Sequence, residues 1–239
     1  MLSPQDLFDL SEFAHAEIFE DCQYVWEALP KIGRYIEQQF AEALKPVIHG
    51  RVSPGAFIEG DVFIGPDTVV EPGVLIHGPT IIGAHCEIRH GAYIRGSVIL
   101  GDHATVGHAS ELKNSILLNH GSAPHFAYVG DSILGNRTNL GAGSRLANLP
   151  VVSTKDPVTK KRPTIRLRVG DQEIDTGLTK FGAILGDEAQ LGCNVVTNPG
   201  CIIGPRTLVY PLVSLKKGYY PAGHLIKLDQ QVVKQVART

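Results

Sequence analysis

The sequence predicts a mainly β protein, a parallel β-helix built from six-residue repeats. An aliphatic residue recurs at every sixth position, a small or β-branched residue follows most of them four positions later, and the pattern returns after an interruption. A six-residue period fits neither a helix nor an ordinary hairpin, and it is typical of hexapeptide β-helices. The aliphatic positions are Val52, Ile58, Ile64, Val70, Ile76, Ile82, Ile88, Ile94, Leu100, Val106, Leu112 and Leu118. The small positions are Ala56, Val62, Thr68, Val74, Thr80, Cys86, Ala92, Val98, Ala104 and Ser110.

Residues 1–46 follow a helical pattern instead, with apolar side chains at helical spacing from Leu7 to Leu44. Ser3 and Pro4 read as an N-cap followed by proline at the first helical position, and Pro30 should divide the segment. We expect two or three helices packed over one end or side of the β-helix, where they would protect its first coil.

Residues 47–215 form the predicted β-helix domain. From Val47 to Ala123 the repeat predicts about four coils of roughly 18 residues, each with three short parallel strands, stacked about 4.8 Å apart. His77, Arg95 and Lys113 each follow an interior aliphatic residue and lie one coil apart, so they should form an outward ladder. Neighbouring cations at that spacing repel by about 1 kcal/mol in water unless an anion lies between them. The alternative is a solvated basic stripe.

The repeat slips at Pro124 and His125 and resumes at Val129, and such a break favours a functional site. It is interrupted again from Leu149 to Thr179 and returns at Leu185. This inserted arm, residues 149–179, is basic in its first half and reads as a hairpin turning at Gly170. A long ordered arm is expected to cover a site or contact a neighbouring subunit.

Residues 216–239 are expected to form a loop and a short amphipathic helix, from about Leu225 to Val236, that caps the last coil. The chain has 239 residues, enough for one large domain or one domain with an appendage. Its formal charge of −2 gives no reason to expect a nucleic-acid partner.

The cysteines and the N-terminus indicate a cytoplasmic protein without a membrane segment. The four cysteines lack the spacing of a metal knuckle or a disulfide framework, which favours reduced, buried thiols. The N-terminus has no basic region followed by an apolar core, and no apolar run approaches the roughly 18 residues of a membrane span.

Four histidines, His103, His108, His120 and His125, lie close together in the sequence and raise the question of a metal site. Zinc needs ligands that converge on one point, and His103 and His108 fall at different phases of the repeat. We therefore expect no metal site, and we read the first three histidines as surface or turn residues.

His125 stands out because of its neighbours. Glu111 precedes it by slightly less than one coil, so a carboxylate could orient the imidazole and raise its basicity, as a general base requires. Arg95 and Lys113 supply cations suited to a phosphate. The amides of Asn139 and Asn148 are able to bind hydroxyls or an amine, and the Gly141–Gly143 run leaves bare backbone for a ligand.

The motifs ELKNS, HFAYVGDS and GNRTNLGAG followed by Asn148 resemble, in order and spacing, the acetyltransferase half of a bacterial bifunctional enzyme. That enzyme is the N-acetylglucosamine-1-phosphate uridylyltransferase/glucosamine-1-phosphate N-acetyltransferase of the hexapeptide-repeat acyltransferase family. The resemblance covers about residues 50–215. It implies a left-handed β-helix, a homotrimer, and N-acetyl transfer from acetyl-CoA to an amino-sugar phosphate.

The resemblance also assigns roles to single residues. His125 would be the general base and Glu111 would orient it, while Ala142 and Cys193 would border the acetyl-CoA channel. The substrate-binding residues would be Arg95, Lys113, Tyr128, Asn139, Asn148 and Lys180.

The chain departs from the family pattern in several places. A helical segment stands where the family has a nucleotidyltransferase domain, so no uridylyltransferase activity is expected. Leu149 replaces a tyrosine, Cys193 replaces a serine, and the loop before Lys180 is longer. Two alternatives follow: an N-acyltransferase for a nucleotide-linked amino sugar, and a non-catalytic scaffold subunit that has kept the fold.

Overall fold

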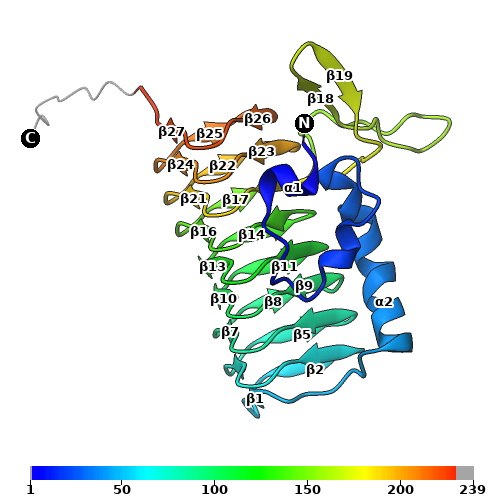
Figure 1. Cartoon of the computed structure of the whole chain (residues 1–239), viewed down its shortest axis with the longest axis vertical. Helices are drawn as coiled ribbons and strands as arrows, with labels where there is room; N and C mark the ends of the chain where they lie inside the picture. The colour runs from blue at the N-terminus through cyan, green and yellow to red at the C-terminus, as the bar shows by residue number, and fades with distance from the viewer. Residues whose placement is uncertain (1, 230–239) are drawn as a thin grey trace, which may run out of the picture.

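The computed structural model describes residues 2–229, and a left-handed parallel β-helix forms most of it (Figure 1). Each coil gives one short strand to each of three parallel sheets. Sheet 1 contains β1 (Arg51–Val52), β4 (Val69–Val70), β7 (Glu87–Ile88), β10 (Thr105–His108), β13 (Ser122–His125), β16 (Asn139–Leu140), β21 (Gln190–Leu191), β24 (Leu208–Val209) and β27 (Leu225–Ile226). Sheet 2 contains β2 (Phe57–Glu59), β5 (Leu75–His77), β8 (Tyr93–Ile94), β11 (Glu111–Lys113), β14 (Tyr128–Gly130), β17 (Arg145–Leu146), β22 (Val196–Thr197) and β25 (Ser214–Leu215). Sheet 3 contains β3 (Val62–Ile64), β6 (Thr80–Ile82), β9 (Val98–Leu100), β12 (Ser115–Leu117), β15 (Ile133–Leu134), β20 (Ala183–Leu185), β23 (Cys201–Ile203) and β26 (Gly218–Tyr220).

The predicted fold class is confirmed, and the repeat forms the core as the sequence indicates. The aliphatic positions from Val52 to Leu112 point inward and form one continuous cluster along the β-helix axis. The small positions fill the space between them; Cys86 and Ala104, for example, are fully buried. Burial raises the pKa of the Cys86 thiol to about 11, which keeps it protonated and unreactive at neutral pH.

The last predicted aliphatic position, Leu118, was wrong by one residue. Leu117 pairs with Leu100 and joins the interior cluster, whereas Leu118 points outward. The register on sheet 2 is still 18 residues at Glu111 and Tyr93, but on sheet 3 it is 17 residues at Ser115 and Val98. The repeat therefore slips in the corner at Asn114, before the Pro124 and His125 position inferred from the sequence.

One column of corners, between sheets 3 and 1, shows how the coils turn. Its residues all adopt left-handed backbone conformations with φ between 54° and 62°, and they are Asp67, His85, His103, His120, Arg137, Glu188 and Arg206. Few side chains tolerate this region, and a repeated turn of one type keeps successive coils in register.

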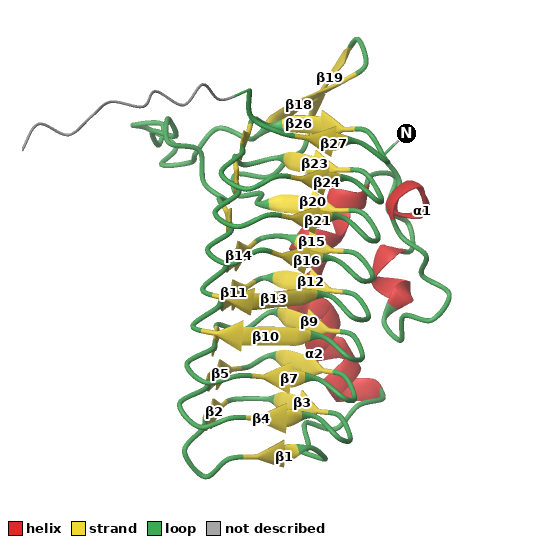
Figure 2. Cartoon of the chain, turned by 90° about the vertical axis from the view of Figure 1, so that its left-hand side faces the viewer, coloured by secondary structure: helices red, strands yellow, loops and turns green. Residues whose placement is uncertain are grey.

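The N-terminal segment, residues 2–44, covers the outer face of sheet 3 (Figures 1 and 2). It contains α1 (Pro4–Leu7), two 3₁₀ helices, η1 (Ala16–Phe19) and η2 (Val25–Lys31), and α2 (Ile32–Glu42). Ser3 precedes Pro4 as expected, and the Asp6 carboxylate accepts hydrogen bonds from the backbone N–H and hydroxyl of Ser3, at 2.9 and 2.8 Å. Pro30 lies near the end of η2, just before α2.

The apolar outer face of sheet 3 explains why the segment packs there. The outward residues Ile81, Ile99, Ile116 and Ile133 are each at most 1% exposed, because Trp26 and its neighbours in the N-terminal segment lie over them. Removing such side chains from water stabilises the fold by about 1.5–3 kcal/mol each. The segment therefore covers one side of the β-helix, one of the two expected placements.

Carboxamides at the sheet 3 corners bind the N-terminal backbone. Asn119 donates to the Glu12 carbonyl at 2.9 Å, Asn136 donates to the Asp9 carbonyl at 2.8 Å, and the Asp187 backbone N–H donates to the Leu7 carbonyl at 3.0 Å. These bonds fix the height of the segment along the β-helix.

The inserted arm forms the predicted hairpin, in which β18 (Arg166–Val169) pairs antiparallel with β19 (Gln172–Asp175). Its base packs on its own chain: Ile165 and Leu167 are buried with the outer face of sheet 3. A Cβ at Gly200 would lie 2.9 Å from Leu167 and 3.0 Å from Ile165, so glycine permits this contact. The base of the arm is thus anchored on its own chain, and the expectation that the arm covers a site or contacts a neighbouring subunit stays a prediction.

The β-helix continues beyond residue 215 through β26 and β27. Leu225 and Ile226, expected to begin a helix, form a strand that pairs with β24. The rest of that expected helix, from residue 230, lies outside the described residues. Within residues 2–229, no helix has the length and apolar character that crossing a membrane requires.

Candidate active site

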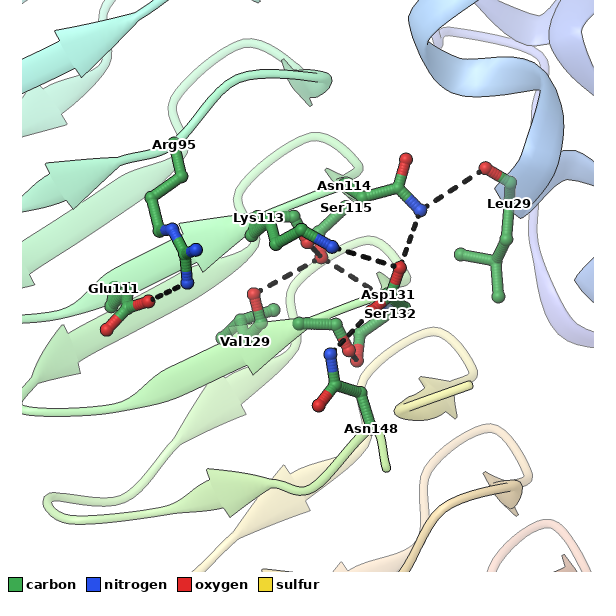
Figure 3. Close-up of polar contacts among 11 residues, drawn as sticks. Leu29, Arg95, Glu111, Lys113, Asn114, Ser115, Val129, Asp131, Ser132 and Asn148 are labelled. Atoms are coloured by element: carbon green, nitrogen blue, oxygen red, sulfur yellow. Dashed lines mark hydrogen bonds and ion pairs between the residues drawn. The ribbon is translucent and has the colours of Figure 1, made fainter. Parts of the chain in front are cut away.

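The cationic ladder on sheet 2 forms as the sequence predicts, but each cation has a carboxylate partner. The register stacks Glu59 beneath His77, and Arg95 and Lys113 continue the column. His77 lies 3.0 Å from Glu59. Arg95 lies 2.7 Å from Glu111, and Lys113 lies 3.7 Å from Asp131 (Figure 3). These contacts reduce the repulsion within the column and hold the cations in place.

Glu111 and Arg95 form the most exposed pair shown in Figure 3. The Arg95 guanidinium donates to Glu111 and lies 5.9 Å from the centroid of the Tyr93 ring, and the Glu111 carboxylate raises the pKa of Arg95. Glu111 thus accepts its hydrogen bond from Arg95 and not from His125. Both side chains of the pair remain more than one-third exposed, so a ligand could displace the contact at modest cost.

Asp131 is the centre of the polar network. It follows β14, is 6% exposed, and lies in the left-handed backbone region with φ 47°. Its carboxylate accepts a hydrogen bond from Asn114 at 2.9 Å and another from Asn148, in addition to the Lys113 contact (Figure 3). Asn114 also reaches the Leu29 carbonyl at 3.5 Å, which links the network to η2. A buried carboxylate with several donors is held rigidly.

Gly130 lets Tyr128 and Asn148 meet over β14. A Cβ at position 130 would lie 2.6 Å from the Tyr128 hydroxyl and 2.8 Å from the Asn148 side-chain nitrogen. Burial, followed by the charges of Glu111 and Asp131, raises the pKa of Tyr128, so its hydroxyl stays protonated at neutral pH. Tyr128, Asn148 and the two ladder cations therefore belong to one cluster on sheet 2.

Lys180 lies at the edge of this cluster, where the inserted arm returns to the β-helix. The backbone N–H of the next residue, Phe181, donates to the Asn148 carbonyl at 2.9 Å. The arm therefore leaves just after Asn148 and rejoins beside it.

The remaining predicted residues lie at the corner between sheets 1 and 2. His125 ends β13, the Gly143 N–H donates to its carbonyl at 3.0 Å, and the Asn194 N–H donates to the Ala142 carbonyl at 2.8 Å. His125, Ala142 and Cys193 consequently occupy successive coils at this corner, and the side chains of His125 and Cys193 are exposed. Asn139 lies on the outer face of sheet 1, paired in register with Ser122 and Gln190.

The structure thus places most of the predicted residues in two groups, one on sheet 2 and one at its corner with sheet 1. The phosphate-type cations, Tyr128, Asn148 and Lys180 form one group. His125, with Ala142 and Cys193, forms the other at the edge where the chain enters β14.

The other histidines stack along the corners instead of converging. The rings of His85, His103 and His120 are nearly parallel, with centroids 4.9 and 4.7 Å apart, and His90 stacks on His108 at 5.6 Å. Among residues 2–229, no group of three or more His, Cys, Asp or Glu side chains is arranged to hold a metal ion.

Sequence reasoning missed Asp131 and Asn114. The available signal was the spacing of the interior residues: five positions separate Leu112 from Leu117 and Val129 from Leu134, where the adjacent repeats have six. Each shortened corner contains one member of the missed pair, with φ 46° at Asn114 and 47° at Asp131.

The chain is similar to known sugar-nucleotide and acetyltransferase proteins. The family model of the GMPPB C-terminal domain matches residues 76–166. A bifunctional sugar-1-phosphate nucleotidylyltransferase/acetyltransferase of Sulfurisphaera tokodaii is 34% identical over 98 residues, which cover 40% of this chain and 22% of that protein. The bifunctional protein GlmU of Methanococcus vannielii is 31% identical over 112 residues, 47% of this chain and 25% of that protein.

Among solved structures, the UDP-N-acetylglucosamine acyltransferase of Francisella novicida aligns with a TM-score of 0.49 and 16% identity, over 71% of this chain and 62% of that one. The match spans only about a quarter of either bifunctional relative. The relatives agree with the resemblance drawn from the three motifs.

Proposed function

We propose that this chain, a β-helix with nucleotidylyltransferase/acetyltransferase relatives, is a hexapeptide-repeat acyltransferase that transfers an acetyl group from acetyl-CoA to the amine of an amino-sugar phosphate. The observation that carries this proposal is the stack of Arg95 and Lys113 on sheet 2, held in place by Glu111 and Asp131. Two fixed cations one coil apart suit the oxygens of a phosphate. Tyr128 and Asn148 beside them supply a hydroxyl and an amide for the sugar.

The proposed chemistry needs one base. His125 removes a proton from the ammonium of the amino sugar, and the free amine attacks the thioester carbonyl carbon of acetyl-CoA. The tetrahedral intermediate then collapses and the C–S bond breaks; the proton held by His125 goes to the leaving thiolate, and the nitrogen loses its second proton to solvent, which leaves the neutral amide and the CoA thiol. No covalent acetyl-enzyme is required. Ala142 and Cys193, stacked beyond His125 at the same corner, would border the acetyl-CoA.

Glu111 is proposed to orient His125 once substrate binds. Without a ligand, its carboxylate is held by Arg95 at 2.7 Å. A phosphate that binds the Arg95 guanidinium would compete with Glu111 for the same donor. The released carboxylate would then be free to accept a hydrogen bond from the imidazole.

Substitution of His125 tests the catalytic assignment. The His125→Ala variant should lower kcat for amino-sugar acetylation by about 10²–10⁴-fold, the usual contribution of a positioned base, with the fold intact. The matched control is His108→Ala, because His108 pairs in register with His125 one coil below and is also exposed. Thiol release from acetyl-CoA measures the rate. If His125→Ala acetylates at nearly the parent rate with the same pH profile, the assignment is wrong.

A nucleotide-linked amino sugar is the second candidate substrate. Leu149 is partly exposed after Asn148, and the arm that follows opens a cavity beside Lys180 large enough for an extended ligand. A panel of amino-sugar phosphates and nucleotide-linked amino sugars, each with acetyl-CoA, would separate the two classes by kcat/KM.

We also propose a homotrimer. Sheet 3 is covered by the chain itself, whereas apolar side chains remain exposed on the other two sheets, including Phe57 on sheet 2 at 65% and Leu208 on sheet 1 at 45%. Burial of these faces between subunits would bring the two residue groups on sheet 2 against a neighbouring chain. Sedimentation equilibrium would measure the mass; a monomer at assay concentration would contradict the proposal.

A further inference from the structure

The base of the inserted arm forms a basic cavity whose cations, apart from Lys180, have no part in the proposed acetyl transfer to an amino-sugar phosphate. It has a volume of about 680 Å³ and lies between the two ends of the arm. Its lining residues are Leu149, Lys155, Lys160, Lys161, Arg162, Thr164, Gly177, Thr179 and Lys180. Five of the nine side chains are cationic and none is acidic.

These cations have no carboxylate partner within the described part of the chain, in contrast to Arg95 and Lys113 on sheet 2. The nearest acid in the sequence, Asp156, is engaged elsewhere: it accepts hydrogen bonds from the backbone N–H groups of Val158 and Thr159. Asp175 is likewise held by Thr164 and by the N–H of Gly177. Both carboxylates have lowered pKa values because of these hydrogen bonds.

The backbone presents the cations in a defined arrangement. A turn closes when the Asp156 N–H donates to the Lys161 carbonyl at 2.8 Å and the Lys160 N–H donates to the Asp156 carbonyl at 2.9 Å. The Arg162 guanidinium donates to the Ser153 carbonyl, which ties the first segment of the arm to this turn. The lysines of this cavity are exposed, so water screens their mutual repulsion, but in a chain with a net charge of −2 such a local concentration of positive charge would attract an anion.

We infer that this cavity binds a diphosphate group of a phosphorylated ligand. The single phosphate of an amino-sugar phosphate could bind Lys180. Its negative charge is too small to offset the four other cations of the cavity as well. A second, more apolar cavity of about 890 Å³ adjoins it and shares Thr164, and Val151 and Val152 line it. The organic part of a diphosphate ligand would fit there.

Two ligands of the proposed reaction class contain a diphosphate: CoA and a nucleotide-linked amino sugar. The inference rests on the proposed function for this choice of ligands. The binding of a diphosphate itself does not depend on catalysis, so it is measurable without turnover.

The test is calorimetric titration of the full chain with inorganic pyrophosphate and with inorganic phosphate. Pyrophosphate should bind at least ten-fold more tightly, and higher salt should weaken it because the contacts are ionic. The double variant Lys160→Ala with Lys161→Ala should weaken pyrophosphate binding at least ten-fold. The control is Arg168→Ala on the same arm, an exposed cation that pairs with Asp171 and does not line the cavity.

Competition then identifies the source of the diphosphate. Displacement of pyrophosphate by CoA would assign the cavity to the acyl donor, and displacement by UDP would assign it to the acceptor. Either result supports the inference. Equal loss in the Arg168→Ala control, or pyrophosphate that neither CoA nor UDP displaces, would overturn it.

The two proposals can fail separately. If pyrophosphate does not bind but acetylation still depends on His125, the cavity inference is wrong and the proposed function stands. If pyrophosphate and UDP bind but no amino sugar is acetylated, the cavity inference stands and the proposed function is wrong.

Discussion

The Asp131 carboxylate lies 3.7 Å from the Lys113 ammonium, one coil away, and it is the buried member of the pair. A lysine held this way keeps its charge at a fixed height on the sheet, because its partner cannot turn to solvent. Asp131 also binds Asn114 and Asn148, so one side chain sets the position of three others.

Asp131→Asn should therefore weaken substrate binding without removing any substrate-binding residue. The amide keeps the size of the carboxylate but loses its charge, and it sets an N–H donor against the donor of Asn148 or Asn114. We expect KM for an amino-sugar phosphate to rise several-fold and the free energy of unfolding to fall by about 1–3 kcal/mol. Asp175→Asn, on the exposed hairpin, is the control. Unchanged KM and unchanged stability would show that Lys113 and Asn148 hold their positions without Asp131.

Thr197 should be a site where the chain becomes more stable on substitution. Its hydroxyl is fully buried in the sheet 2 column of the core, between Leu146 and Leu215, and has no hydrogen-bond partner within residues 2–229. Burying an unpaired hydroxyl costs about 1–3 kcal/mol, so Thr197→Val should stabilise the fold by about 1 kcal/mol or more. Chemical denaturation measures the change.

Thr68→Val is the matched comparison. The Thr68 hydroxyl donates to the Gly83 carbonyl at 2.7 Å and accepts from the Cys86 N–H at 2.9 Å. Its removal leaves two buried groups unpaired and should destabilise the fold. If both variants shift stability in the same direction, hydrogen bonding of the buried hydroxyl does not explain either effect.

His15 should make stability depend on pH. Burial lowers its pKa in the folded chain, although the charges of Glu17 and Asp102 offset part of the effect. In the unfolded chain a histidine titrates near pH 6.5. Above that pH both states are neutral and His15 has no effect. As the pH falls below about 6.5, the unfolded state binds more protons, and stability falls until the folded form is protonated too.

The variant His15→Gln tests this dependence because glutamine does not titrate and is still able to bond to the Tyr35 hydroxyl, which lies 2.9 Å from His15. Between pH 7.5 and 5 the parent should lose stability more steeply than the variant. His224→Gln, at an exposed site, is the control for the loss of a histidine elsewhere in the chain. The same slope in all three proteins would contradict the prediction.

The sequence predicted the β-helix well because an interior position must be apolar in every coil, and each coil repeats the requirement. It misplaced the slip because Leu117 and Leu118 are both leucines, and pattern alone cannot tell which one faces inward. That error hid the shortened corners, and with them Asn114 and Asp131. The placement of the N-terminal segment was open for another reason: helical spacing shows that a face is apolar, but not which sheet it meets.

The sequence predicted many of the residues of the site, but not which side chains pair with each other. Glu111 is less than one coil from both Arg95 and His125, and sequence distance does not rank two partners at nearly equal separation. The fold determines which residue pairs with Glu111. Arg95 directly follows β8, the strand next to β11 in the same sheet, whereas His125 ends β13 at the corner between sheets 1 and 2. A guanidinium also offers a stronger, charge-assisted hydrogen bond than a neutral imidazole.

The N-terminal segment has a consequence for how the molecule comes apart. In a solenoid each coil touches only its neighbours, so the ends can open while the middle stays folded. Here one segment packs on Ile81 near the first coils and on Ile184 and Ile202 far above them, and it bonds to Asn119, Asn136 and Asp187 between. Opening any coil in that range would break contacts with a segment shared by all of them. The coils from β6 to β23 should therefore unfold cooperatively. Amide hydrogens of strands that lie on the uncovered sheets outside that range, β1 and β2 at one end and β24, β25 and β27 at the other, should exchange first.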